Sequence, residues 1–231
     1  MKKLGIVGGL SPESTIPYYK GIVYGVQKKI GDNILPNLTI ESINVYQVLN
    51  LCVAQKYDEL TEYLLAAINN LATAGADFAA ISANTPHIVF DRLAEKSPLP
   101  LVSIIDACCN EALNRGLKKI ALMGTKFTME GDFFKKPFIK AGIELITPNN
   151  NEIELINQKI LSELEQGIVR DETRDIFIKI IERMKAENGA EAIILGCTEL
   201  PLILNDSVSP LPCLDTMQIH IKTLVDLITA P

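Results

Sequence analysis

A cysteine at the end of an apolar run is the residue that the sequence places best for chemistry. Cys197 follows Gly196 and the apolar residues 192–195, and a helix is expected to begin directly after it. A thiol at a helix N-terminus has a lowered pKa, so we expect a Cys197 thiolate to be accessible near neutral pH. The alternative is a buried structural cysteine, which is the commoner fate of a free thiol, but the location favours a functional role.

The remaining cysteines are not placed in this way. Cys108 and Cys109 fall in an expected helix and Cys213 in a short strand, which favours structural roles. The five cysteines form no CxxC pair and no metal-ligand spacing with the two histidines. The spacing therefore predicts no metal site. Because an odd number of cysteines argues against a disulfide framework, we expect free thiols and a cytoplasmic protein.

The two histidines have different surroundings in the sequence. His87 follows Thr85 and Pro86 and is expected in the first turn of a helix, where it is either a general base or a polar support for the loop. A capping or packing role is about equally favoured for it. His220 lies inside the expected C-terminal helix and is interpreted as structural.

Short apolar runs alternate with helical patterns along the whole chain. Strands are predicted at residues 3–7, 38–45, 78–82, 102–105, 117–123, 143–146, 192–195 and 212–214. Helices are predicted at residues 12–29, 57–74, 127–140, 152–166 and 172–187, and from the last strand to about residue 228. The alternation indicates an α/β fold with a mainly parallel sheet flanked by helices.

Four polar loops follow the expected strands. Ligands of open parallel sheets bind beyond the carboxyl ends of the strands, and hydroxyl groups and amides at helix N-termini suit a carboxylate or a phosphate. Simple helix capping is the alternative, as for Ser11 ahead of Pro12. The glycines at positions 5, 8 and 9 do not have dinucleotide-binding spacing, and there is no phosphate-binding loop of the Walker type. The loops are residues 8–15, 82–87, 124–128 and 196–199.

The second half of the chain repeats the first. Residues 2–9 (KKLGIVGG) parallel 118–125 (KKIALMGT), and residues 75–85 (GADFAAISANT) parallel 189–199 (GAEAIILGCTE). The second alignment places Ala83 opposite Cys197.

A looser match aligns Asp106 with Asp215. We therefore predict two pseudo-symmetric lobes, residues 1–107 with 211–231 and residues 108–210, with the active site in the cleft between them.

Three motifs carry a resemblance to a known family. They are GIVGGLSPEST at residues 5–15, ANTPH at 83–87 and GCTE at 196–199. With these motifs the chain resembles the aspartate/glutamate racemase superfamily, nearest its aspartate-racemase-like branch, over essentially its whole length. The resemblance implies two α/β lobes around an amino acid, usually in a homodimer, and a mechanism without cofactor or metal. In this mechanism two cysteines, one from each lobe, act on opposite faces of the substrate α-carbon.

The chain departs from the family pattern at the first cysteine. That position is Ala83, which neither accepts nor donates a proton, so Cys197 is left with a water or His87 as the second acid/base. The residues expected to bind substrate are Gly9, Ser11, Asn84, Thr85, Thr125, Thr198 and Glu199. Lys126 is the only cation in the four loops, with Lys20 nearby in the first helix, so a small or uncharged amino acid is an alternative to an acidic one.

Three functions are consistent with this site. The leading one is a cofactor-independent amino-acid racemase with asymmetric or reduced activity. The second is a malonate-type decarboxylase of the same superfamily, in which a single cysteine protonates the enediolate. The third is a non-catalytic protein that binds an amino acid or a dicarboxylate.

Composition excludes several other classes of partner. The chain of 231 residues has a net charge of −6, which gives no electrostatic attraction for nucleic acid or an anionic membrane. No apolar run approaches the ~20 residues of a transmembrane helix. A small-molecule ligand is therefore the expected partner.

Overall fold

The computed structural model describes residues 1–230 and divides into two compact units. The first unit is Met1–Ile104 with Met217–Pro231, and the second is Ile105–Thr216. Within the described residues, no helix has the length and apolarity to cross a membrane.

The first unit contains a four-stranded parallel sheet in the order β2-β1-β3-β4. The strands are β1 (Leu4–Gly8), β2 (Leu38–Ser42), β3 (Phe78–Ile81) and β4 (Leu101–Val102). β1 and β3 are continuous buried apolar runs because helices cover both faces of the central strands.

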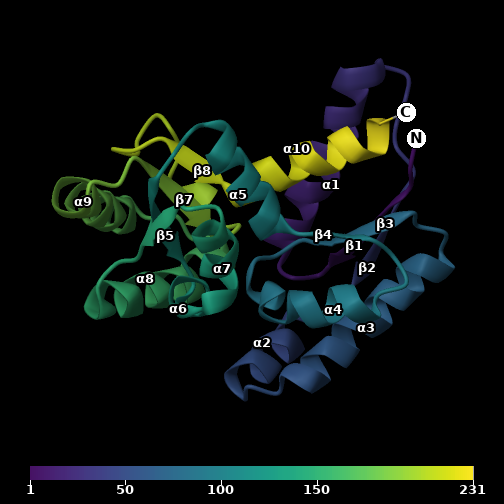
Figure 1. Ribbon diagram of the computed structural model, residues 1–231, viewed down its shortest axis with the longest axis horizontal. Coiled ribbons are helices and arrows are strands. Elements are labelled where there is room, and N and C mark those ends of the chain that lie inside the picture. The colour runs from purple at the N-terminus through teal and green to yellow at the C-terminus, as the bar shows by residue number, and fades with distance from the viewer. Residues whose placement is uncertain (231) are drawn as a thin grey trace. The chain divides into compact units, whose positions relative to one another are not determined.

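Helices of the first unit lie on both sides of its sheet, with α1 and α10 on one side and α3 and α4 on the other (Figure 1). Leu4 and Ile6 of β1 pack in one buried cluster with Tyr18, Ile22 and Ile221. Ser11 caps the first helix and Pro12 begins it, as predicted. The helical segments are α1 (Pro12–Ile30), α2 (Val45–Val53), α3 (Tyr57–Thr73), η1 (Thr85–Val89), α4 (Phe90–Lys96) and α10 (Thr216–Thr229).

The second unit repeats this sheet. Its parallel strands have the order β6-β5-β7-β8. They are β5 (Lys119–Gly124), β6 (Glu144–Ile146), β7 (Ala192–Gly196) and β8 (Cys213–Asp215). The predicted α/β fold with two similar parallel sheets is therefore confirmed.

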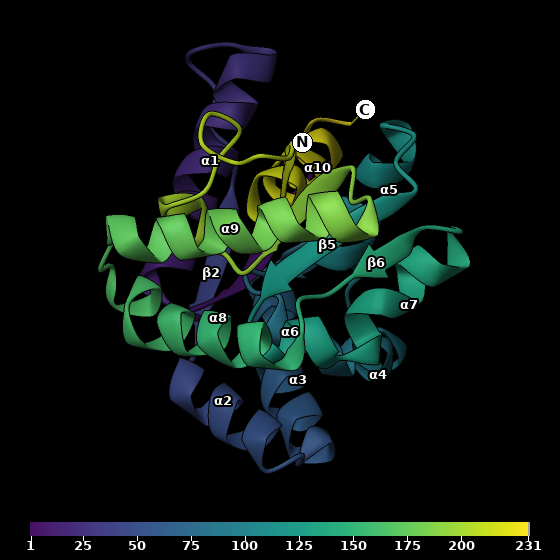
Figure 2. The same cartoon turned by 90° about the vertical axis from the view of Figure 1, so that its left-hand side faces the viewer.

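In the second unit, α8 and α9 run side by side across the sheet (Figure 2). Arg183 of α9 joins them with two hydrogen bonds, of 2.8 and 2.5 Å, to the two carboxylate oxygens of Glu152 in α8. The helical segments are α5 (Ile104–Asn114), α6 (Lys126–Glu130), α7 (Asp132–Lys140), α8 (Asn150–Ser162), η2 (Leu164–Gln166), α9 (Asp171–Asn188) and η3 (Leu200–Leu202).

The last strand was predicted in the first lobe, and this placement is wrong. β8 pairs with β7, Cys213 lying opposite Ile193, so it completes the second sheet. The chain leaves the first unit after Ile104 and returns to it at Met217. The helix after β4, α5, therefore belongs to the second unit, and the helix after β8, α10, belongs to the first. Whether the lobes are independent domains stays a prediction.

The looser repeat match is also in the wrong register. Leu101 lies opposite Ala79 and Cys213 opposite Ile193. Since Ala79 and Ile193 are aligned in the repeat, Asp215 corresponds to Ser103 rather than to Asp106.

Candidate functional site

In the second unit, two adjacent strands end on paired glycines. Gly124 of β5 lies opposite Gly196 of β7, and a Cβ on Gly124 would be 2.9 Å from the Gly196 carbonyl oxygen. Only glycine allows the strands to approach this closely. Thr125 and Cys197, which directly follow these glycines, therefore lie at the ends of two neighbouring strands.

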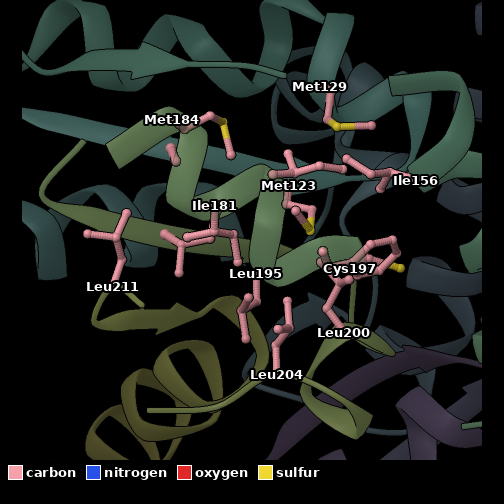
Figure 3. Packing of buried hydrophobic residues seen from close by; sticks show 14 of the residues in the cluster. Met123, Met129, Ile156, Ile181, Met184, Leu195, Cys197, Leu200, Leu204 and Leu211 are labelled. Carbon is pink, nitrogen blue, oxygen red and sulfur yellow. The ribbon is translucent and has the colours of Figure 1, made fainter. Parts of the chain in front are cut away.

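Cys197 lies at the edge of the main core of this unit. It packs in the same buried cluster as Leu164, Leu195 and Leu200, and Figure 3 shows it on the Leu200 side of that cluster. The residue is 7% exposed. The cysteine is thus close-packed on one side, and its sulfur has a defined polar partner.

That partner is Glu199. The Cys197 thiol donates a hydrogen bond of 2.9 Å to Glu199 Oε2, and the Thr198 hydroxyl donates one of 3.0 Å to the same oxygen. All three side chains are buried. Two donors converging on one oxygen fix the carboxylate beside the sulfur.

The expected low pKa of Cys197 is wrong. Burial first, and then the negative charge of Glu199 that accepts the thiol hydrogen, hold the pKa of Cys197 well above its ordinary value. A backbone hydrogen bond from Glu199 acts in the opposite direction but is the weaker effect. The residues that follow form only the three-residue 3-10 helix η3, so the dipole of a long helix is missing. Cys197 is therefore a thiol at neutral pH.

Glu165 is a second acidic residue of this site, and the sequence analysis did not identify it. Burial and the charge of Glu199 raise the pKa of the Glu165 carboxyl to about 7, and Glu165 in turn acts on Cys197. It lies on the short segment η2, whose Leu164 packs in the same cluster as Cys197. No local sequence motif marks it, because its approach to Cys197 arises from the packing of η2.

Glu163 fixes the segment that carries Glu165. Its buried carboxylate accepts a hydrogen bond of 2.5 Å from the Thr173 hydroxyl and pairs with Lys159 at 2.6 Å. Its carbonyl oxygen accepts bonds from the N–H groups of Gln166 and Ile168. These bonds tie η2 to both α8 and α9.

The strand end beside Cys197 carries a capped helix. Thr125 caps α6, and its hydroxyl lies 3.2 Å from that of Thr128. Lys126 pairs with Glu154 of α8. The only cation of the four loops is therefore neutralised within its own unit.

In the first unit, the loop after β1 has an unusual backbone. Gly9 has φ +73°, and a Cβ there would lie 2.3 Å from the Ile43 carbonyl oxygen. Ser11 has φ +94°, a conformation that non-glycine residues rarely adopt. Such strain concentrates at functional sites, although Ser11 also serves as helix cap by accepting the Ser14 N–H at 3.1 Å.

The loop after β3 is anchored to the loop after β1. The Ser14 hydroxyl donates to the Ser82 carbonyl oxygen, and the Ser82 hydroxyl donates to that of Val7 at 3.1 Å. Ala83 and Thr85 are half-buried, and Asn84 is buried. Ala83 is the second residue after β3 and Cys197 the first after β7. The strand register agrees with their alignment in the repeat, because Ile81 lies opposite Val7 and Leu195 opposite Met123.

His87 is bonded through both ring nitrogens. Nδ1 lies 2.9 Å from the Ala83 carbonyl oxygen, and Nε2 accepts the Ile104 N–H at 3.3 Å. Burial lowers the pKa of His87 to about 4. These bonds favour the supporting role over that of second acid/base.

The residues interpreted as structural are all buried. Cys108 and Cys109 lie in α5 and Cys213 in β8, and all five cysteines are free in the described part of the chain. His220 accepts the Tyr18 hydroxyl hydrogen at Nδ1. Residues 1–230 contain no cluster of His, Cys, Asp and Glu suited to a metal ion.

Comparison with known proteins identifies the family. A sequence model of the Asp/Glu/Hydantoin racemase family matches residues 7–224. The chain is a member of this family. The broad specificity amino-acid racemase RacX of Bacillus subtilis is 23% identical to it over 225 residues, which cover 96% of each chain.

Solved structures have the same fold. An aspartate racemase homologue from Pyrococcus horikoshii is 37% identical, with a TM-score of 0.87 over 100% of both chains. Aspartate racemase from Picrophilus torridus is 19% identical, with a TM-score of 0.76 over 99% of this chain and 94% of that one. The racemase-family fold thus extends over the whole chain.

Proposed function

We propose that this protein is an amino-acid racemase that uses no cofactor and has Cys197 as its only cysteine acting on the substrate α-carbon. The observation that carries the proposal is the hydrogen bond from the Cys197 thiol to Glu199, beyond a strand end in a racemase-family chain. In this pair the thiol is a proton donor in contact with a proton acceptor, the carboxylate. Cys197 can therefore return a proton as the thiol and remove one as the thiolate.

The loops beyond the strands would bind the α-carboxylate. Asn84 and Thr85 would supply side-chain and backbone donors, Thr198 would supply its backbone N–H because its hydroxyl donates to Glu199, and Gly9 and Ser11 would close that end of the site. Thr125 is assigned to the same site. Donors directed at the carboxylate stabilise the charge that develops on it when the α-carbon loses its proton.

The second face of the α-carbon would be served by water. Ala83 has no titratable side chain, and the two backbone bonds of His87 engage both of its ring nitrogens. We therefore assign the second proton transfer to a water molecule and keep His87 as the support of the loop. Racemisation through water on one face is slower than through a positioned thiol.

The substrate class follows from the available charges. Arginine, which best recognises a carboxylate, is not found in the four loops, and Lys126 is already paired. We propose a small or uncharged amino acid as the preferred substrate, with aspartate and glutamate as poorer ones. The homodimer and the cytoplasmic location expected from the sequence belong to the same proposal.

Exchange of the α-proton with solvent tests the function. The protein is incubated in D2O with a panel of L- and D-amino acids, and the α-proton signals are followed by NMR. Loss of the signal without release of carbon dioxide supports racemase chemistry. Binding without exchange would contradict it and leave a binding protein.

The single thiol also makes decarboxylation the second candidate. A decarboxylase needs only one proton donor, because carbon dioxide leaves from the opposite face. The same NMR assay with substituted malonates decides the matter: release of carbon dioxide with no exchange of amino-acid α-protons would favour the decarboxylase.

A further inference from the structure

We propose that Glu199 and Glu165 carry the proton of Cys197 to solvent between turnovers, an inference that rests on the proposed racemase function. In a two-cysteine enzyme each turnover exchanges the protonation states of two thiols. Here Ala83 leaves one thiol, so a proton taken up by Cys197 from substrate has to leave before the next turnover. A route for that proton is therefore a requirement of this chain.

The first step of the route is in place. Cys197 Sγ lies 2.9 Å from Glu199 Oε2 and donates to it, so the proton already points at its acceptor. Transfer turns the thiol and carboxylate into a thiolate and a carboxylic acid, with no change in the total charge. The Thr198 hydroxyl, at 3.0 Å from the same oxygen, holds the acceptor in position.

The second step connects a buried group to a partly exposed one. Glu199 is 4% exposed, whereas Glu165 is only half-buried. The two carboxylates interact, and burial and the charge of Glu199 raise the pKa of Glu165 to about 7. Because Leu164 of η2 packs in the cluster that contains Cys197, we assign the next proton transfer, from the acid form of Glu199, to the neighbouring Glu165 carboxylate, which then releases the proton to water.

The segment that carries Glu165 is held in place for this role. Glu163 bonds Thr173 and Lys159 through its side chain, and its carbonyl oxygen accepts two backbone N–H groups around the turn. Leu164 on the same turn packs in the cluster that contains Cys197. Glu163 is thus a positioning residue, and the charged side chains that act on Cys197 are Glu199 and Glu165.

Neutral variants separate a proton route from a merely electrostatic effect. Glu199→Gln and Glu165→Gln each remove a negative charge near the sulfur, so the thiolate forms more easily. The alkylation of Cys197 by iodoacetamide, followed by mass spectrometry of its peptide, should then shift to lower pH by about one unit. This measurement needs no substrate.

The rate of substrate α-proton exchange in D2O should fall in these variants, although more of Cys197 is thiolate. If the carboxylates carry the proton, the exchange rate falls by about 10²-fold in Glu199→Gln, and less in Glu165→Gln, despite the larger thiolate fraction. Glu182→Gln, an exposed position on α9, is the matched control and should change neither measurement. Circular dichroism checks folding, and either variant alone suffices for the test.

The outcomes distinguish this inference from the proposed function. A rise in both thiolate fraction and exchange rate would overturn the relay, because the carboxylates would then only suppress the thiolate. An unchanged alkylation profile and an unchanged exchange rate in both variants would also overturn the relay. If the parent protein exchanges no α-proton at all, the racemase function fails and the relay's part in turnover fails with it, whatever the alkylation profile.

Discussion

At the scale of single residues, the direction of the hydrogen bond between Cys197 and Glu199 determines how the sulfur can act. The thiol is the donor and the carboxylate the acceptor, and burial disfavours the thiolate further. Cys197 is therefore an acid in the resting protein and becomes a base only after giving up its proton. This makes the rate of any abstraction step rise with pH.

Removing the thiol should slow the reaction strongly. In Cys197→Ala the α-proton exchange rate is expected to fall by about 10²–10⁴-fold, the usual contribution of a positioned proton donor. NMR in D2O measures it. Cys109→Ala, a buried cysteine of α5, is the control and should keep the parent rate. Near-parent exchange in Cys197→Ala would remove the thiol from the mechanism.

The proposed mechanism, with Cys197 as its only cysteine, predicts an asymmetry between enantiomers. The enantiomer whose α-hydrogen faces Cys197 should exchange much faster, since Ala83 offers no base on the other face. The equilibrium constant between enantiomers is one, so only rates differ. Ala83→Cys should accelerate the slow enantiomer, as seen in initial exchange rates. Equal parent rates with no gain in the variant would mean that another group serves the second face.

At the scale of secondary structure elements, strongly periodic segments were predictable and their junctions were not. α1, α3 and α9 lie within about two residues of their predicted bounds because apolar spacing and caps agree there. The strand predicted at residues 38–45 ends at Ser42, since Asn44 caps α2 by accepting the Tyr46 N–H. Asn44, with apolar residues spaced like a helix after it, was the overlooked signal.

Other differences arise where tertiary packing decides between helix and strand. Ile104 and Ile105 were predicted in a strand, but they are buried in the first turn of α5. The helix predicted at residues 127–140 is divided into α6 and α7 at Gly131. A helix was expected with His87 in its first turn, but His87 lies in the 3-10 segment η1, and the α-helix α4 begins only at Phe90.

The site was predictable where motifs mark it and not where distant segments meet. Cys197 and Glu199 are two residues apart in the sequence, but the sequence does not tell that the thiol donates its proton to the carboxylate. Glu165 reaches them through the fold of η2 alone. The pKa of Cys197 was predicted with the wrong sign because burial and a carboxylate outweigh a helix that is only one turn long.

A buried hydrogen-bond chain joins three elements of the first unit. The Tyr18 hydroxyl of α1 lies 2.7 Å from His220 Nδ1 on α10, and His220 Nε2 lies 3.1 Å from the Val102 carbonyl oxygen of β4. Tyr18→Phe leaves the buried Nδ1 without its donor. We expect a loss of about 1–3 kcal/mol in the free energy of unfolding, measured with urea.

The same helix provides a control for this variant. Tyr24→Phe removes a hydroxyl from a residue that is 63% exposed, so stability should change by less than about 0.5 kcal/mol. Equal effects of the two substitutions would show that the chain from Tyr18 to Val102 does not stabilise the fold.

At the scale of the whole molecule, two neutral buried histidines set an acid limit. Burial lowers the pKa of His87 to about 4, and burial together with repulsion from the protonated form of His87 lowers the pKa of His220 to about 3. Between these values and about 6.5 the unfolded chain binds protons that the folded one does not, so stability is lost as pH falls below 6.5. Urea unfolding should show a slope of about 1.4 kcal/mol per pH unit for each histidine.

The contribution of His220 to that slope can be isolated. His220→Gln lowers stability at every pH but should make the dependence between pH 6 and 5 shallower, because one proton uptake is removed. An unchanged slope would show that other groups, such as the paired carboxylates, set the acid limit.

The exchange of helices between units makes the two halves unequal as folding units. The second unit is one continuous segment, Ile105–Thr216, whereas the first needs α10 from the end of the chain. Met217, Ile221 and Leu224 of α10 are buried against the first sheet. Burial of each such side chain contributes about 1.5–3 kcal/mol, and the whole of a domain's stability is about 5–15 kcal/mol.

A chain that stops at Thr216 should therefore unfold in one unit only. Hydrogen exchange read by mass spectrometry should show that β1 and β3 lose their protection, while β5 and β7 keep theirs. Deletion of residues 230–231, which follow α10, is the control and should leave all four strands protected. Retained protection of β1 and β3 in the shortened chain would show that the first sheet is stable without α10. Loss of protection in β5 and β7 as well would show that the second unit is not a domain in its own right.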